Sequence, residues 1–166
     1  MTNLAEASAI ERITTIEALQ GHVGHELGVG DWFAVTQDRI NAFAESTDDH
    51  QWIHVDPERC KTAGRGGTIA HGYLTLSLIT LLRRSLHGAQ IDIPTKMGIN
   101  YGSDRVRFIT PVKSGARIRI RVALLALNQI EPSVWQAKYK HTVEIEGEVR
   151  PALVAETLNR MYLAAP

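Results

Sequence analysis

The sequence has only one cysteine, no net charge and no long hydrophobic run. Cys60 therefore cannot form an intrachain disulfide, which is typical of proteins from a reducing compartment. Eighteen Lys and Arg residues balance eighteen Asp and Glu residues, so no basic stripe can follow a phosphate backbone, and we expect no nucleic-acid partner. The longest apolar stretch, Tyr73 to Leu82, is only ten residues long and contains Thr75, Ser77 and Thr80. A membrane-spanning helix needs about 20 mostly apolar residues, so we expect a buried helix here.

Targeting and cofactor motifs are missing as well. The first residues, MTNLAEASAIERITT, have no basic start and no apolar stretch, so we expect no signal peptide and a cytoplasmic location. The serines form no Gly-x-Ser-x-Gly elbow, and Cys60 has no reactive-thiol signature. Gly64, Gly66 and Gly67 do not follow a predicted strand, which excludes a dinucleotide fingerprint.

What the chain does have is enough apolar residues for one folded domain. Its 166 residues are 44% hydrophobic, and they contain no internal repeat and no linker-like run. We therefore expect a single domain over residues 1–166, with residues 1–10 flexible.

The first half of the chain predicts helices. Apolar spacing predicts helices over 13–27 and 36–46, the second capped by Thr36, with a short strand over 31–35 between them. Residues 47–54 have neither helical nor strand periodicity and predict an ordered loop. Asp56 and the following proline predict a short helix, and residues 64–68 a flexible corner. Residues 73–88 are apolar nearly all round, which predicts a central buried helix ended by a glycine.

The second half of the chain predicts strands. Segments 97–109, 116–130, 134–146 and 149–163 are rich in strand-favouring residues, and residues 117–122 alternate strictly between arginine and aliphatic side chains. Pro132 and Gly147 mark turns. The sequence therefore predicts an α+β domain in which a curved antiparallel sheet wraps around one helix.

The loop TDDHQWIH is the first candidate for chemistry. An aspartate accepts or orients a proton, and a histidine exchanges protons near neutral pH, so the two together can polarise a water molecule. The alternative is that Asp48 caps a turn and that the histidines are solvated. A metal site competes for the same residues, because His50 and His54 are four apart, as in His-Glu-x-x-His zinc sites. Gln51 stands where those enzymes need a general base, and the segment lacks helical periodicity, so we predict no metal.

Two further clusters lie outside this loop. Ala70-His71-Gly72 precedes the central helix, whose first turn presents free N–H groups, and a carbonyl oxygen can approach the N–H of a glycine closely. The alternative is that Gly72 only permits close packing. Arg105 and Arg107 share one strand face and can bind an anionic group of the substrate, such as a phosphate. The alternative is that they form a solvated face.

These residues together resemble a known family. FAESTDDHQWIHVDP, followed after a gap by GGTIAHGYLTLSL, resembles the MaoC-like dehydratases, the (R)-specific enoyl-CoA hydratases. HQWIHVDPERC is especially similar to the branch named after nodulation protein N, in which Gln-Trp replaces the more common Asn-Pro. The resemblance covers roughly residues 20–160.

The resemblance implies a hot-dog fold, a homodimer and a hydro-lyase that adds water to trans-2-enoyl-CoA. Its catalytic pair falls on Asp49 and His54, its oxyanion N–H on Gly72, and a hydroxyl further along the helix on Thr80. To substrate binding we also assign three further residues, Trp52, His71 and Arg105. No metal or redox cofactor is implied, because coenzyme A arrives with the substrate.

Two other functions use similar parts. A hot-dog acyl-CoA thioesterase hydrolyses the thioester, and a non-catalytic subunit only binds acyl-CoA. The intact pair of Asp49 and His54, followed by His-Gly, favours the hydratase. Which of the two groups accepts the proton of the water, and which acyl chain is used, stay open.

Overall fold

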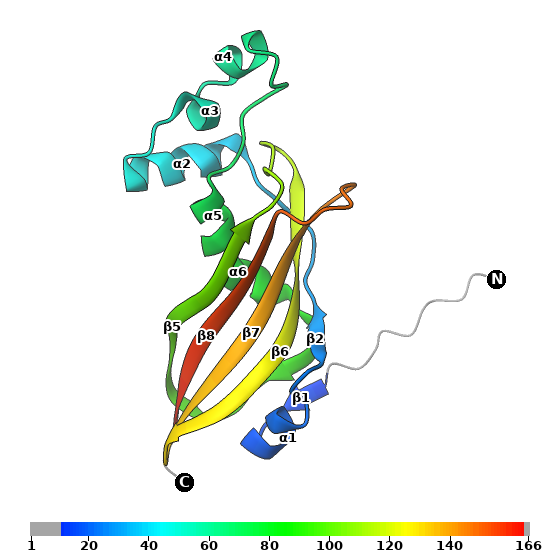
Figure 1. The fold of residues 1–166 in the computed structure, drawn as a ribbon, viewed down its shortest axis with the longest axis vertical. Coiled ribbons are helices and arrows are strands. Elements are labelled where there is room, and N and C mark those ends of the chain that lie inside the picture. The colour runs from blue at the N-terminus through cyan, green and yellow to red at the C-terminus, as the bar shows by residue number, and fades with distance from the viewer. Residues whose placement is uncertain (1–10, 165–166) are drawn as a thin grey trace, which may run out of the picture.

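The computed structural model describes residues 11–164, so the expectation for residues 1–10 lies outside the described residues. One curved sheet and one helical path through its concave side make up most of the fold (Figure 1). The strands are β1 (Glu11–Ile13), β2 (Glu26–Val29), β3 (Phe33–Ala34), β4 (His87–Ile91), β5 (Thr95–Phe108), β6 (Arg117–Glu131), β7 (Val134–Ile145) and β8 (Leu153–Leu163). The helices are α1 (Ile16–Gln20), α2 (Gln37–Thr47), α3 (Trp52–Val55), α4 (Pro57–Thr62), α5 (Gly72–Ser77), α6 (Ile79–Leu82) and the 3₁₀ helix η1 (Arg83–Ser85).

The strands follow the order β1-β4-β2-β6-β7-β8-β5, and β3 pairs with β6. The long strands β5 to β8 pair antiparallel, as the sequence predicts, whereas β1 and β4 form a parallel pair that was not expected. Along β6, Ile118, Ile120 and Val122 are fully buried, and the arginines between them face outward. The alternation therefore sets which face of the sheet meets the helix.

The core lies between this inner face and the helical path α5–α6, from which Leu74, Leu78 and Leu82 are buried. Leu78 lies between α5 and α6 but keeps right-handed helical angles, so the path continues through it. A sheet wrapped around a central helix confirms the α+β, hot-dog prediction. Among residues 11–164, no helix is long and apolar enough to cross a membrane.

The prediction of one helix over 13–27 is wrong. Residues 11–13 form β1, whose Ile13 pairs with Ile91 of β4, and only residues 16–20 are helical. Gly24 has a φ of 89°, which ends helical geometry, and the chain then enters β2. The apolar residues that suggested a helix, such as Leu19, are still buried. The apolar pattern therefore identified buried positions correctly but not the type of secondary structure.

The central helix is also shorter than predicted. It ends at Ser85, because Leu86 is extended and residues 87–91 form β4. Gly88 is therefore not a helix cap. A Cβ on Gly88 would lie 2.3 Å from the Leu27 carbonyl oxygen, so this glycine allows β2 and β4 to pair closely.

Candidate active site

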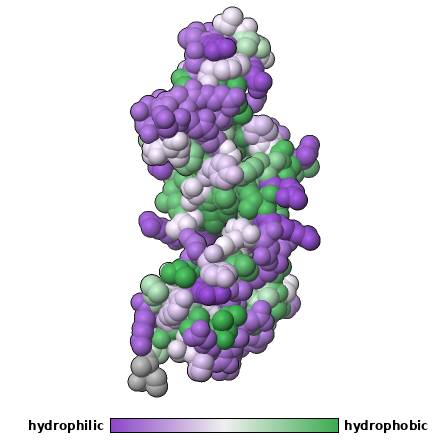
Figure 2. Space-filling view, turned by 60° about the vertical axis from the view of Figure 1, so that its left-hand side comes forward, coloured by the Kyte–Doolittle hydropathy of each residue, from purple (hydrophilic) through white to green (hydrophobic). Residues whose placement is uncertain are grey.

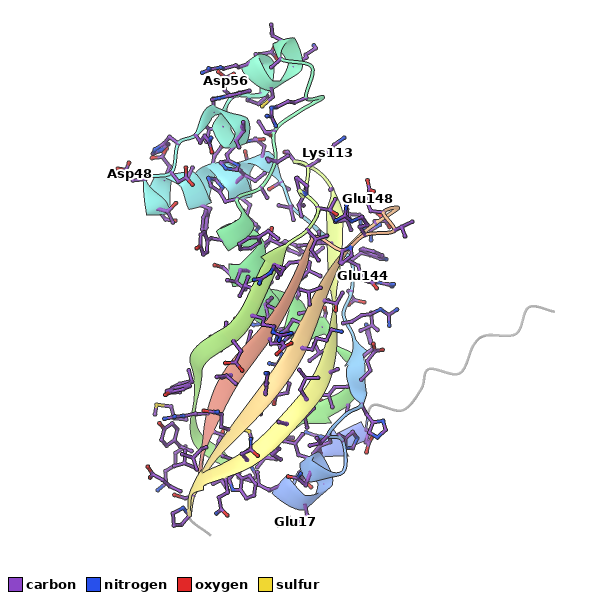
Figure 3. The ribbon with its side chains drawn as sticks, in the orientation of Figure 1. Glu17, Asp48, Asp56, Lys113, Glu144 and Glu148 are labelled. Atoms are coloured by element: carbon purple, nitrogen blue, oxygen red, sulfur yellow. The ribbon has the colours of Figure 1, made fainter. Side chains whose placement is uncertain are left out.

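Helices α2, α3 and α4 stand together over the end of the sheet, next to the start of α5 (Figure 1). The Thr36 hydroxyl caps α2 and the Asp56 carboxylate caps α4, as predicted. Asp48 follows α2 in the left-handed region, with a φ of 57°, and its side chain is solvent-exposed at the end of that helix (Figure 3). This turn directs the chain back toward α5. The predicted loop over 47–54 differs in two respects: α2 extends to Thr47, and the single helical turn α3 starts at Trp52.

His54 lies on α3 and is 7% exposed. The Gln37 side-chain amide donates to the His54 carbonyl oxygen (2.7 Å), and the Ile69 N–H donates to the Ile53 carbonyl oxygen (3.0 Å). The imidazole Nδ1 donates to the Ile69 carbonyl oxygen (2.7 Å), because a carbonyl can only accept. In the neutral ring this leaves the lone pair on Nε2, which is the form that a proton acceptor requires.

His71 anchors the other side of the site. Its Nε2 donates to the backbone carbonyl oxygen of Asp49 (2.9 Å), and its ring stacks on His54 with 3.8 Å between centroids. Because His71 is 3% exposed, it acts as a buried support that fixes where the Asp49 backbone lies. The Asp49 carboxylate stays 55% exposed, with Oδ2 4.0 Å from His71 Nε2.

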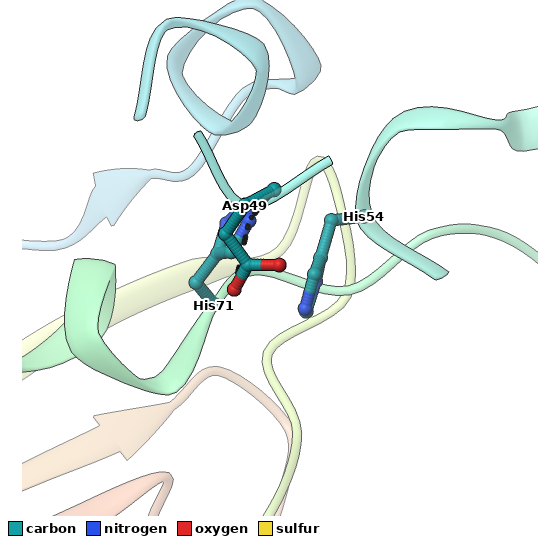
Figure 4. A group of neighbouring side chains, drawn as sticks. All are labelled: Asp49, His54 and His71. Atoms are coloured by element: carbon teal, nitrogen blue, oxygen red, sulfur yellow. Dashed lines mark hydrogen bonds and ion pairs between the residues drawn. The ribbon is translucent and has the colours of Figure 1, made fainter. Parts of the chain in front are cut away.

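Asp49, His54 and His71 therefore converge in one group (Figure 4). One ligand-type atom from each of them lies within 4.8 Å of the others. A carboxylate and an imidazole ring this close together can hold one water molecule between them and accept a proton from it.

The same three residues are also the only group among residues 11–164 with metal-ligand spacing. His71 Nε2, the nitrogen that faces Asp49, already donates to a carbonyl oxygen, so it offers no lone pair in this arrangement. The alternative zinc pair of His50 and His54 does not form. His50 instead contacts Glu45 (2.9 Å) on the surface, and this hydrogen bond raises the pKa of His50.

Gly72 is the first residue of α5, and none of the hydrogen bonds within residues 11–164 uses its N–H. Gly72 and His54 line one cavity of about 290 Å³, together with Thr75 and Phe108. A Cβ on Gly72 would lie 3.0 Å from the Phe108 ring, so only glycine leaves this approach to the N–H open. The cavity thus combines an imidazole with a free backbone donor, the pairing needed to stabilise a developing oxyanion.

The remaining predicted residues lie apart from this group. Thr80 lines a second cavity, of about 440 Å³, further along the helix. Trp52 packs against two guanidinium groups, those of Arg59 (4.5 Å to the ring centroid) and Arg65 (5.5 Å). Arg105 lies on β5 with a 76% exposed side chain, 4.0 Å from Glu156.

Two residues of the site had no signal in the sequence. Gln37 donates to the His54 carbonyl oxygen, which ties α2 to α3, and it accepts a hydrogen bond from the Thr68 hydroxyl, which ties α2 to the segment before α5. Phe108, at the end of β5, covers Gly72. Both act across 17 or more residues of chain, so no local pattern could have identified them.

Residues 18–145 match the MaoC-like domain family. The chain belongs to this family. The predicted MaoC-like dehydratase is therefore confirmed at the level of the family.

Relatives agree with this assignment. The chain is 41% identical to 3-hydroxyacyl-thioester dehydratase Z of Mycobacterium tuberculosis, over 90% of this chain and 97% of that protein. It is 48% identical to nodulation protein N of Rhizobium leguminosarum bv. viciae, over 80% of this chain and 82% of the relative. Among solved structures, the (R)-hydratase from A. caviae involved in PHA biosynthesis superposes with a TM-score of 0.62 at 26% identity, covering 83% of this chain and 98% of that one.

Proposed function

We propose that the protein is an (R)-specific enoyl-CoA hydratase, which reversibly adds water to a trans-2-enoyl-CoA to give (R)-3-hydroxyacyl-CoA. The observation that carries this proposal is the Asp49 carboxylate beside the His54 imidazole, which itself lines a cavity together with Gly72. The relatives named as a dehydratase and an (R)-hydratase support the same reaction.

In the hydration direction, Asp49 and His54 hold the water molecule next to C3 of the enoyl group. The water oxygen bonds to C3, one of its protons passes to the pair, and the C2–C3 double-bond electrons move toward the thioester oxygen. The Gly72 N–H donates to that oxygen as it becomes negative. A proton then returns from the pair to C2, so the pair ends in its starting protonation state and the elements of water are added.

We further propose that the reaction uses no metal and no redox cofactor, and that coenzyme A enters only as part of the substrate. A hydration is not a redox reaction, and the three protein groups already supply an acceptor, a proton donor and an oxyanion donor. The carboxylate, the imidazole lone pair and the backbone N–H are all available without a metal.

A homodimer is the proposed assembly. β5 is the last strand of the sheet and pairs only with β8 among the described residues. Four large apolar side chains on β5 and the adjacent α5 are 48–70% exposed: Tyr73, Met97, Tyr101 and Phe108. Figure 2, in which the β5 side of Figure 1 comes forward, shows hydrophobic side chains gathered in the middle of this face. A second copy that pairs through β5 would cover both the strand edge and this patch.

One assay separates hydratase, thioesterase and binding subunit. Crotonyl-CoA is mixed with the protein, and the enoyl absorbance and the free thiol are followed together. We expect the absorbance to fall with no release of thiol. Release of thiol would identify a thioesterase, and no change in either signal would identify a binding subunit, so each of these outcomes rejects the proposal.

A further inference from the structure

A second cavity, of about 440 Å³, lies further along the central helix than the catalytic cavity. Thr80 and Arg83 line it from the helix, and β5, β7 and β8 supply the opposite wall. Thr80 is eight residues beyond Gly72, which corresponds to about 12 Å along a helix axis. An acyl chain whose thioester oxygen meets the Gly72 N–H has to extend over this distance to enter the second cavity.

The sheet wall of this cavity is a chain of hydrogen-bonded polar side chains. Asn159 Nδ2 donates to Asn100 Oδ1 (2.7 Å), and the Thr157 hydroxyl donates to Asn159 Oδ1 (3.3 Å). Since a threonine hydroxyl has one proton, His141 Nδ1 must be the donor in its 3.3 Å contact with Thr157 Oγ1. The lone pair of His141 is therefore on Nε2.

His141 Nε2 has no hydrogen-bond partner within residues 11–164, although His141 is only 1% exposed. Burial, together with the charge of Arg83, lowers the pKa of His141 to about 3, so the ring is neutral at physiological pH. It therefore provides an unpaired acceptor on the wall of this cavity.

Arg83 provides the complementary donor. Its guanidinium lies over the Tyr139 ring, 4.4 Å from the centroid, and none of the arginine and lysine ion pairs within residues 11–164 includes it. A plain alkyl chain would leave both Arg83 and His141 Nε2 facing methylene groups, which disfavours that chain. A carboxylate would satisfy the guanidinium but would place its oxygens against the His141 lone pair.

We propose that this cavity selects enoyl thioesters whose acyl chain carries a hydroxyl group far from the thioester. The substrate hydroxyl donates to His141 Nε2 and accepts from Arg83. This assignment rests on the proposed hydratase function and names the substrate class of that same site, with Arg83 and His141 as its specificity-determining residues.

The test compares three enoyl-CoA substrates of equal, medium chain length that end in a methyl, a hydroxyl or a carboxylate group. Hydrogen bonds that involve a charged partner favour the hydroxylated substrate by about ten- to a hundredfold in kcat/KM. Equal or faster hydration of the methyl substrate would overturn the inference, and so would fastest hydration of the carboxylate substrate. Crotonyl-CoA, which is too short to reach the second cavity, is assayed first: if it is not hydrated, the proposed function itself has failed.

Variants locate the preference. His141→Leu removes the acceptor and Arg83→Leu removes the donor, so each should reduce the preference for the hydroxyl over the methyl substrate at least tenfold. Arg84→Leu is the matched control, because Arg84 is exposed and lies outside this cavity, and it should keep the preference. Thermal melting shows whether each variant is folded. If either His141→Leu or Arg83→Leu is not folded, the other variant alone tests the assignment. An unchanged preference for the hydroxyl substrate in a folded variant overturns it.

Discussion

A double-mutant cycle on Asp49 and His54 tests whether these two groups act on one water molecule. Asp49→Asn keeps the shape of the side chain and the backbone carbonyl that His71 binds, so the fold should be unaffected. His54→Ala removes the hydrogen bond to the Ile69 carbonyl oxygen and the stacking on His71, and it should reduce the free energy of unfolding by about 1–3 kcal/mol.

Each single variant should lose about 10²- to 10⁴-fold in kcat, the usual contribution of a general acid or base. Independent groups would multiply to a loss of about 10⁴- to 10⁸-fold in the double variant. Because a carboxylate oxygen of Asp49 and a ring nitrogen of His54 lie within 4.8 Å of each other, we expect the double variant to be little worse than the poorer single variant.

The assay is the initial rate of crotonyl-CoA hydration, with circular dichroism to confirm folding. Asp48→Asn and His50→Ala are the controls, because both residues lie in the same loop and point to the surface. Asparagine also tolerates the left-handed backbone that Asp48 adopts. Losses at Asp49 and His54 that simply multiply would refute the shared water, and inactive Asp48 or His50 variants would refute the site.

Three further outcomes are expected. Gly72→Val should lower kcat by about 10²-fold or more, because the side chain blocks the N–H against Phe108; a folded variant with normal turnover would place the oxyanion donor elsewhere. His141 is neutral in the fold and has a lowered pKa, so the unfolded chain binds its proton first and stability should fall as pH drops below about 6.5, by about 1.4 kcal/mol per pH unit. Chemical unfolding of His141→Gln should show a weaker pH dependence, and an equal slope would contradict this. Activity should survive prolonged chelation, whereas loss with recovery on added zinc would assign a metal to Asp49, His54 and His71.

Short-range sequence patterns predicted the features that depend only on neighbouring residues. The alternation over residues 117–122 predicted a face of the sheet, and the caps Thr36 and Asp56 predicted where two helices start. Residues 13–27 were predicted wrongly because their structure depends on distant pairing. Ile13 pairs with Ile91, and Gly88 serves the contact of β2 with β4 rather than a helix end.

In the active site, too, the sequence predicted residues that lie close together along the chain but not the contacts with distant residues. The resemblance to the MaoC-like family placed the catalytic pair on Asp49 and His54, two residues that the structure brings together, but it could not show what holds them. That support comes from His71, which bonds to a backbone 22 residues away, and from Gln37, which bonds to one 17 residues away. The unpaired Nε2 of His141 was equally inaccessible to sequence reasoning, because it arises from the pairing of β7 with β8.

The configuration at C3 of the hydrated product tests the central claim most directly. Crotonyl-CoA is hydrated to equilibrium and the 3-hydroxybutyryl group is resolved by chiral chromatography. A site in which Asp49 and His54 hold water against one face of the substrate predicts a single enantiomer with no free thiol, and the proposed (R)-hydratase function predicts that it is the (R) enantiomer. The (S) enantiomer, a racemic product or release of thiol would contradict the account.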